Sequence, residues 1–137
     1  MALKVRRIDY FYTTVKDKPG EAYKLLSQLA ASEINLLAFG ITPDARGHTS
    51  LTLFPESVEE LARLAAGGGY SLVGPQRAFL IQGDDELGAL VEIHRALGDA
   101  QINIYAGNGV TDGAGSFGYV LYVKPEDYEQ AARLLRV

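Results

Sequence analysis

Apolar and polar positions follow two different periods in the first part of the chain. Residues 7–15 form a run rich in β-branched and aromatic side chains, which predicts a strand. Both faces of this run carry aromatic residues, so we expect the strand to be central and covered on both sides. The segment after Gly20 instead spaces its apolar residues three and four positions apart, which predicts a helix. This apolar stripe contains Ala22, Leu25, Leu26, Leu29 and Ala30.

The next segments predict a hairpin, a helix and a short strand. Residues 34–42 and 49–54 have strand composition and are separated by a turn, which indicates a β-hairpin. Ser57 and Glu60 have the spacing of a capping box at the start of a helix. We expect the inward positions of that helix to be Val58, Leu61, Ala62 and Ala65. A fourth strand is predicted at 70–73, with Gly74-Pro75 as a joint, so the order is β-α-β-β-α-β.

The second half of the chain repeats the first. A shift of 68 positions maps Asp17 onto Asp85 and Gly20 onto Gly88 without a gap. The same shift maps Phe11 onto Phe79, Leu29 onto Leu97, Ile34 onto Ile102 and Asn35 onto Asn103. Similarity at one fixed offset indicates one structural unit used twice. We therefore predict a first repeat over residues 6–74 and a second over residues 75–137.

The second repeat has its own predicted elements. Its first helix has an apolar stripe, its second strand spans 102–111 with a glycine-rich bulge at 107–109, and a further strand spans 117–123. The last helix begins at Pro125, and the chain provides no strand after it. Because the shift maps Leu3–Val5 onto Ser71–Val73, we predict that residues 2–5 complete the second sheet. The helix stripes contain Leu90, Ile93, His94, Leu97 and Gly98, and then Tyr128, Ala131, Ala132 and Leu135.

Composition removes several classes of function. The absence of cysteine excludes disulfides and thiolate chemistry. Thirteen basic against seventeen acidic residues, a net charge of −4, opposes a nucleic-acid partner. The sequence has neither a signal-peptide core nor an apolar run of the roughly 20 residues that a membrane helix needs. We therefore expect a cytoplasmic protein without a membrane partner.

Two motifs flank the first predicted helix: the loop Asp17-Lys18-Pro19-Gly20 before it and Glu33-Ile34-Asn35-Leu36 after it. Together with the β-α-β-β-α-β order, they resemble the ACT domain, a small regulatory module that binds amino acids and similar metabolites. The second copy departs from the pattern at Leu87, which replaces the proline. The resemblance implies an α+β, ferredoxin-like fold, with antiparallel sheets and helices on one face, in two tandem repeats. ACT domains are commonly attached to catalytic or DNA-binding domains, whereas this chain resembles a free-standing pair.

The resemblance also implies a ligand site at each helix start. Free amides there suit the carboxylate of an amino acid, an aspartate would accept from its ammonium group, and the asparagine after the helix could hold either group. In a similar family member, the second strand of a neighbouring unit would complete the pocket. The implied site residues are Asp17, Pro19, Gly20, Glu21 and Asn35 in the first repeat, and Asp85, Leu87, Gly88, Ala89 and Asn103 in the second.

Simpler roles remain open for these residues. The aspartates could only cap a helix and the asparagines only tie down a loop. Gly20 and Gly88 could serve tight packing, with no ligand at all. His94 and His48 lack a third ligand in the sequence, so no metal site and no cofactor is predicted.

The predicted function is therefore that of a metabolic sensor rather than an enzyme. No nucleophile has a neighbouring base, so no catalytic residue is proposed. We expect a homodimer that binds an amino acid or similar metabolite and regulates a separate enzyme. The alternative is a structural module that forms dimers or binds an enzyme without any ligand.

Overall fold

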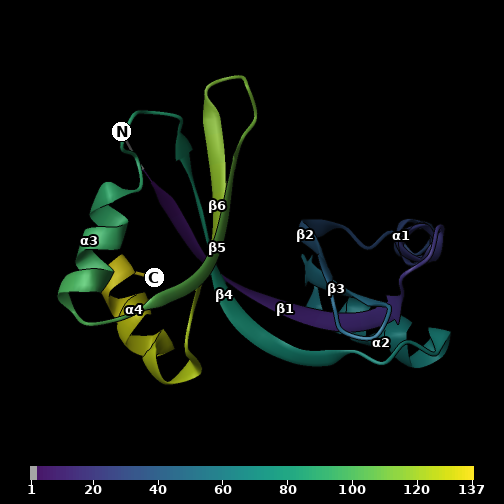
Figure 1. Ribbon diagram of the computed structural model, residues 1–137. Coiled ribbons are helices and arrows are strands. Elements are labelled where there is room, and N and C mark those ends of the chain that lie inside the picture. Colours follow the sequence, from purple (N-terminus) through teal and green to yellow (C-terminus); the bar gives the residue numbers. More distant parts are fainter. Residues whose placement is uncertain (1–2) are drawn as a thin grey trace. The chain divides into compact units, whose positions relative to one another are not determined.

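The computed structural model describes residues 3–137, which form two compact units (Figure 1). The N-terminal unit is Asp9–Gln76, and the C-terminal unit is Arg77–Val137 with the N-terminal segment through Ile8. The elements are β1 (Lys4–Lys16), α1 (Glu21–Ala31), β2 (Leu36–Pro43), β3 (His48–Pro55), α2 (Val58–Gly68), β4 (Val73–Asp84), α3 (Val91–Asp99), β5 (Ile104–Thr111), β6 (Ser116–Val123), a 3-10 turn (Pro125–Asp127) and α4 (Tyr128–Leu135).

The strands are hydrogen-bonded in the order β2-β3-β1-β4-β6-β5. Both hairpins, and the pairs β1–β3 and β4–β6, are antiparallel, so the predicted α+β class is confirmed. β1 is an inner strand, as its sequence predicts. Its cover is incomplete, because Ile8, Tyr10 and Phe11 are buried whereas Thr14 is exposed. No helix within residues 3–137 is long and apolar enough to cross a membrane.

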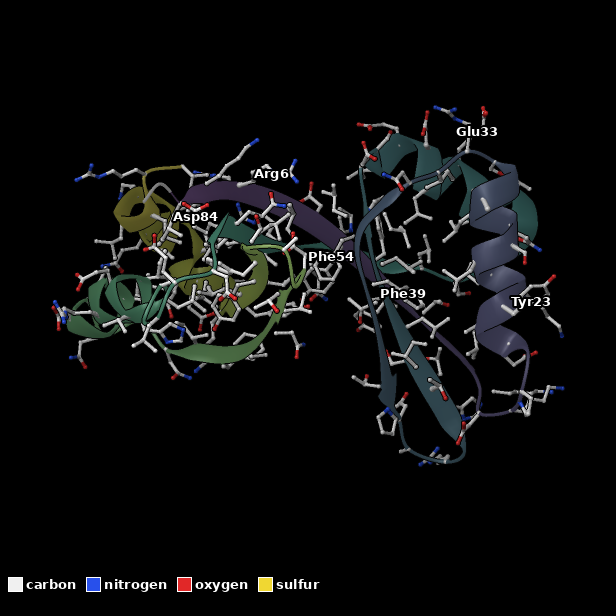
Figure 2. The ribbon with its side chains drawn as sticks, turned by 90° about the horizontal axis from the view of Figure 1, so that it is seen from above. Arg6, Tyr23, Glu33, Phe39, Phe54 and Asp84 are labelled. Carbon is white, nitrogen blue, oxygen red and sulfur yellow. The ribbon has the colours of Figure 1, made fainter. Side chains whose placement is uncertain are left out.

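The core of the N-terminal unit lies between its helices and one face of its strands. Leu25 and Leu29 of α1 and Leu61 of α2 pack with Phe11, Ile34, Leu51 and Leu53. Phe39 packs at the edge of this core, whereas Tyr23 projects from α1 and is 73% exposed (Figure 2). The predicted stripes are too wide, because Ala30 and Ala62 are exposed. Each of these two short helices buries only the narrow stripe of residues that faces the sheet.

The core of the C-terminal unit has the same plan, with α3 and α4 on one face of their strands (Figure 1). Ile93 and Leu97 of α3 meet Tyr128, Ala131 and Ala132 of α4, as predicted, together with Phe79, Ile81 and Leu121 of the strands. Leu3 and Val5 pack at the edge of this core. The predicted inward positions His94 and Gly98 are exposed instead.

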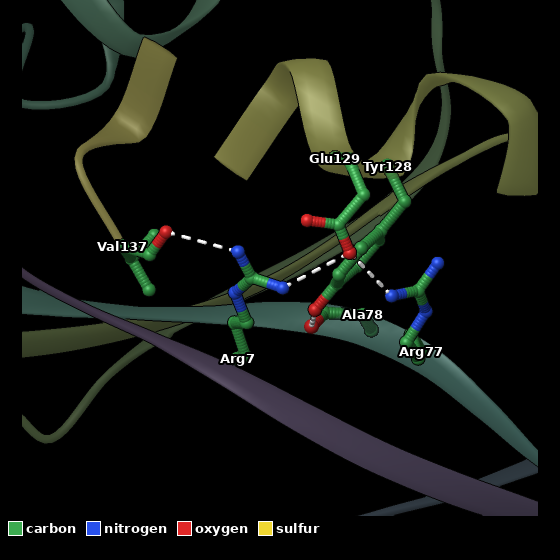
Figure 3. A network of polar contacts seen from close by, with 6 residues as sticks. All are labelled: Arg7, Arg77, Ala78, Tyr128, Glu129 and Val137. Carbon is green, nitrogen blue, oxygen red and sulfur yellow. Dashed lines mark hydrogen bonds and ion pairs between the residues drawn. The ribbon is translucent and has the colours of Figure 1, made fainter. Parts of the chain in front are cut away.

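A polar network ties the start of β1 to the last helix within the C-terminal unit (Figure 3). The Arg7 guanidinium donates to Glu129 Oε2 at 3.1 Å and to the Val137 carbonyl at 3.1 Å. Arg77 donates to the same Glu129 oxygen at 2.7 Å, and its guanidinium lies 4.1 Å from the centre of the Tyr128 ring. The Tyr128 hydroxyl donates to the Ala78 carbonyl at 2.8 Å. One carboxylate therefore holds two segments that are far apart in sequence.

We expect Glu129→Gln to reduce the loss of folding stability that occurs as the pH falls. Hydrogen bonds from Arg77 and Arg7 lower the pKa of the Glu129 carboxyl. Because the pKa of Glu129 is lower in the folded state, its ionised form stabilises the protein at pH values above the unfolded-state pKa of about 4.3. This stabilisation is lost as the pH falls through the folded-state pKa. The effect is small because the side chain is 55% exposed. Melting temperatures measured at about pH 7 and about pH 3 should differ less in the variant.

The control for this pH experiment is Glu126→Gln. Glu126 lies on the neighbouring 3-10 turn and forms no ion pair within the described part of the chain. If both variants reduced the pH dependence of the melting temperature equally, the effect could not be assigned to the contacts of Glu129 with Arg7 and Arg77.

Three sequence predictions of element bounds are wrong. Residues 70–72 are not a strand, and β4 runs from Val73 through the expected joint at Gly74-Pro75 to Asp84. The register shift in β5 lies between Ile104 and Ala106 rather than at 107–109, where the glycines pair in regular order. The helix expected after Asp85 starts only at Val91. The start of β4 and the register shift in β5 depend on pairing with neighbouring strands, which the local period of apolar residues does not indicate.

Segments related by the shift of 68 form the same backbone hydrogen bonds. Phe11 pairs with Leu53 across β1 and β3, and Phe79 pairs with Leu121 across β4 and β6. The Ile34 and Ile102 amides both close their preceding helix by donating to a leucine carbonyl at 2.9 Å. Glu33 and Gln101, which precede these isoleucines, both have positive φ, 57° and 63°. The similarity in sequence thus extends to turn geometry.

Candidate functional site

The two loops before α1 and α3 are held in the same way. The Asp17 amide donates to the Gly47 carbonyl at 2.9 Å, and the Asp85 amide donates to the Gly115 carbonyl at 2.9 Å. Gly20 and Gly88 both have a left-handed backbone, with φ of 91° and 74°, which favours glycine at these positions. Each loop is therefore fixed to the turn of the following hairpin.

Helix capping does not explain Asp17 and Asp85. The N-cap residue is Gly20 in α1 and Leu90 in α3, and neither helix has a side-chain cap hydrogen bond. The simpler role considered for these aspartates is thus unsupported by the geometry. Their side chains are exposed, so they remain accessible to a ligand.

Only part of the expected set of free amides is present. The Ala89 amide donates to the Glu86 carbonyl at 3.0 Å, and the Glu21 amide approaches the Lys18 carbonyl at 3.5 Å. The Gly20 and Gly88 amides have no backbone acceptor among residues 3–137. The helix start in the second repeat thus offers Gly88, and not Ala89, as a donor.

The loop before α3 lines a cavity of about 360 Å³, which we call the C-terminal cavity. Its wall comes from three segments of the C-terminal unit: the loop and first turn of α3, the end of β5, and the start of β6. The lining residues are Asp85, Glu86, Gly88, Ala89, Leu90, Val91, Gly109, Val110, Thr111 and Phe117. Three of the predicted residues therefore share one cavity.

The other predicted residues of the second repeat lie outside this cavity. Leu87 is fully exposed, at 108% relative accessibility. Asn103 follows α3 and is exposed at the opposite end of that helix, which has nine residues, so about 13 Å of helix separates it from the cavity. Within this repeat the structure does not bring Asn103 together with Asp85.

Asn35 in the first repeat has a structural partner. Its side-chain amide donates to the Glu56 carboxylate, and the Glu56 amide donates to the Asn35 carbonyl at 3.0 Å. These bonds fit the loop-tying role considered from sequence. α1 has eleven residues, which places Asn35 about 16 Å from the helix start. Within this repeat, one small ligand therefore cannot touch both Asn35 and Asp17.

The helix start of the first repeat has different surroundings. Glu21 accepts from Lys24 at 3.0 Å, and this bond is the main reason that the pKa of the Glu21 carboxyl is lowered. Glu21 lines a cavity of about 480 Å³, the N-terminal cavity, whose other lining residues are Thr13, Thr14, Val15, Lys16, Gly69, Tyr70, Ser71 and Val73. Asp17, Pro19 and Gly20 are exposed but are not part of its lining.

A tyrosine supports the β5 side of the C-terminal cavity. The hydroxyl of Tyr119 lies 3.1 Å from His94 Nε2, and the two rings stack at 5.8 Å. Burial raises the pKa of Tyr119. A Cβ at Gly107 would lie 2.6 Å from the Tyr119 hydroxyl, whereas one at Gly109 would lie 3.4 Å from the ring. His94 is thus a hydrogen-bond and ring-stacking partner of Tyr119.

Sequence reasoning missed the β5–β6 contribution to the site. Val110, Thr111 and Phe117 line the cavity, but their spacing carries no motif. The Phe39 to Gly107 exchange between the repeats is a usable signal, because it removes a large side chain from the strand that faces the helix start. The two motifs of the family resemblance cover the loop before the helix and the residues directly after it, and their counterparts in the second repeat do not include Val110, Thr111 or Phe117.

No protein-family model matches the sequence, and no curated protein is similar to it. Among solved structures, a protein from Bacteroides thetaiotaomicron is similar over 96% of this chain and 88% of its own, with a TM-score of 0.81 and 15% identity. The regulatory subunit of aspartate kinase from Thermus flavus matches over 98% and 94%, with a TM-score of 0.59 and 15% identity. The ligand-free form from Thermus thermophilus matches over 98% and 93%, with a TM-score of 0.60 and 17% identity. These similarities show an ACT-like α+β fold.

Proposed function

We propose that this protein is a regulatory module of two ACT-like repeats that binds an amino acid in the C-terminal cavity. The carrying observation is that Asp85, Gly88 and Ala89, selected by family resemblance, line one cavity of about 360 Å³. A cavity of this size accommodates a small metabolite. The similar aspartate kinase structures are described as regulatory subunits, which supports a regulatory rather than a catalytic role.

The cavity suggests how each part of an amino acid would be held. The carboxylates of Asp85 and Glu86 lie on its wall and would accept from the ammonium group. The free Gly88 amide would donate to the ligand carboxylate. Leu90, Val91 and Phe117 offer apolar surface to the side chain. Acidic groups without a lining cation disfavour a ligand with a second negative charge.

Ligand binding would act by favouring one of two states of an assembly. We propose a homodimer, and a separate enzyme as the receiver of the signal. A ligand shifts such an equilibrium only by its difference in affinity for the two states. Sedimentation of the protein with and without the bound amino acid would report the shift directly.

Thermal unfolding in the presence of each amino acid tests the binding proposal. A ligand at about 100 times its dissociation constant adds roughly 2.7 kcal/mol of stability. We expect this stabilisation with at least one amino acid. No stabilisation by any of them at 10 mM would contradict amino-acid binding.

Val110→Glu is expected to remove that stabilisation with little effect on the fold. Val110 lines the cavity and is 73% exposed, so a glutamate fits there but places a third carboxylate at the site. The matched control is Thr42→Glu, the equivalent position of the first repeat, which is also exposed. We expect calorimetric binding to weaken at least tenfold in Val110→Glu and to persist in Thr42→Glu. Equal loss in both variants would exclude the C-terminal cavity as the site.

A ligand-independent association module is the second candidate. β2 and β5 are the outer strands of the sheet order, and neither contains a charged residue. Long uncharged edges readily pair with another chain. A stable oligomer that is insensitive to every amino acid tested would favour this function.

A further inference from the structure

The two helix starts have opposite charge. Lys16, Lys18 and Lys24 in the first repeat correspond to Asp84, Glu86 and Glu92 in the second under the shift of 68. All three positions are therefore inverted in sign, although the loops share their backbone hydrogen bonds. A site that selects an ammonium group in one repeat would not select it in the other.

One of the three inverted positions, Lys16, lines the N-terminal cavity. This cavity of about 480 Å³ lies between the end of β1, the first residue of α1 and the segment 69–73. Its lining includes Thr13, Thr14, Tyr70 and Ser71, which are residues with hydroxyl groups, and Lys16. All of these residues belong to the N-terminal unit. The cavity is thus more polar in its chemistry than the C-terminal cavity.

The lysine of the lining forms no ion pair. Glu21 is the one carboxylate among the lining residues, and it forms its ion pair with Lys24 at 3.0 Å. Lys16 forms no ion pair within residues 3–137. Lys16 and Lys18 lie close enough to act on the Glu21 charge. The local balance of charge therefore favours an anion.

A buried threonine lines the same cavity. Thr13 is the buried polar residue of β1, at 4% exposure, and it lines the cavity. Its hydroxyl forms no side-chain hydrogen bond within residues 3–137, and it is not enclosed, because Arg6 Nε is the one fully enclosed side-chain atom there without a partner. The equivalent residue of the second repeat is Ile81, so packing at this position does not require a hydroxyl. An oxygen of a ligand in the cavity would give this hydroxyl a hydrogen-bond partner within reach of the strand.

We propose that the N-terminal cavity binds a small organic anion that carries a phosphate or carboxylate group. Lys16 provides the countercharge, and the hydroxyls of Thr13 and Ser71 donate to the anion oxygens. This site is distinct in position and in charge from the amino-acid site of the C-terminal cavity. The two repeats then take ligands of opposite character, and either site can be lost without the other.

The test is a titration of the full chain followed by ¹H–¹⁵N spectra at constant ionic strength. Inorganic phosphate, glycerol phosphate and succinate are the probes, so that the phosphate and carboxylate arms are separated. We expect one of them to give saturable shifts at the amides of residues 13–16 and Ser71. Spectra without saturable shifts in this region for all three probes would overturn the proposal, whatever the outcome at the C-terminal cavity.

Charge reversal provides the first matched pair of variants. We expect Lys16→Glu to weaken anion binding at least tenfold. Lys124→Glu makes the same change in net charge at an exposed position of the C-terminal unit and should leave the affinity within twofold. If both substitutions weakened anion binding equally, the anion would be attracted only by net charge, and the proposed site would be excluded. Val110→Glu should not change anion binding, which separates this test from that of amino-acid binding.

Thr13→Val separates a ligand role from a structural one. Valine has nearly the shape of threonine and removes the unpartnered hydroxyl. We expect the ligand-free protein to melt at the same or a higher temperature, because no hydrogen bond within the described residues is lost. Anion affinity should fall at least threefold. A lower melting temperature with unchanged affinity would assign the hydroxyl to the fold and overturn its role in binding.

Discussion

Replacing Leu97 by alanine is expected to destabilise the protein by about 3–4 kcal/mol. Leu97 is fully buried in the core of the C-terminal unit, and its carbonyl accepts from the Ile102 amide at 2.9 Å. The shorter side chain loses apolar contacts and leaves an internal cavity, because the rigid Phe79 and Tyr128 rings, stacked at 4.4 Å, cannot close the gap. Urea unfolding followed by circular dichroism measures the change.

Two further leucines calibrate this experiment. Leu29, the equivalent residue of the first repeat, is 2% exposed, and Leu29→Ala should cost a similar amount, about 3 kcal/mol. Leu134 lies on α4 but is 40% exposed, so Leu134→Ala should cost less than about 1 kcal/mol. A small loss for Leu97→Ala, comparable to that of Leu134→Ala, would contradict the described core.

Replacing Gly107 by alanine is expected to cost about 1–3 kcal/mol and to disturb the C-terminal cavity. The new Cβ would lie 2.6 Å from the Tyr119 hydroxyl, 2.9 Å from Cε1 and 3.0 Å from Cζ. Tyr119 is 8% exposed and bonded to His94, so its ring has little room to move. Thermal unfolding measures the stability, and calorimetry measures amino-acid binding, which should weaken because Gly109 and Val110 follow on the same strand.

The residues of the first repeat suggest a second substitution that should compensate for Gly107→Ala. Phe39, Leu51 and Leu26 occupy the positions of Gly107, Tyr119 and His94, so a larger residue on β2 is accompanied by a smaller one on β3. We therefore expect Tyr119→Leu to recover part of the loss caused by Gly107→Ala. Gly109→Ala is the control, because its Cβ would meet Tyr119 at 3.4 Å and needs little adjustment. Additive losses in the double variant would exclude the steric explanation.

Most elements of this fold could be predicted from the sequence. The hairpins, the four helices and the inward positions Leu25, Leu29, Ile93 and Leu97 follow from local apolar period, because each element must bury one face. The site was predicted in part. Asp85, Gly88 and Ala89 line a cavity, but Asn35 and Asn103 lie at the far ends of the helices, and Leu87 is exposed.

The failures have a common physical cause. The start of α3 at Val91, the engaged amide of Ala89 and the bond from Asn35 to Glu56 all depend on which donors meet which acceptors after folding. The hydroxyl of Thr13 is similar, because a threonine in a strand gives no sign of whether its partner exists. Such facts are properties of individual donor and acceptor pairs in the folded chain, and the period of apolar residues does not encode them.

The order of residues is enough to establish the offset of 68 positions and the inversion of three charged positions, and the family resemblance carried by that order implies the α+β class. Packing in the folded chain settles which amides near the helix starts stay free, that Leu3 and Val5 pack against the second core, and where Val110 and Phe117 enclose a cavity with the loop. The reason is that a cavity is the space left after all side chains have packed. Its shape depends on every neighbour at once, whereas a helix or strand depends largely on its own residues.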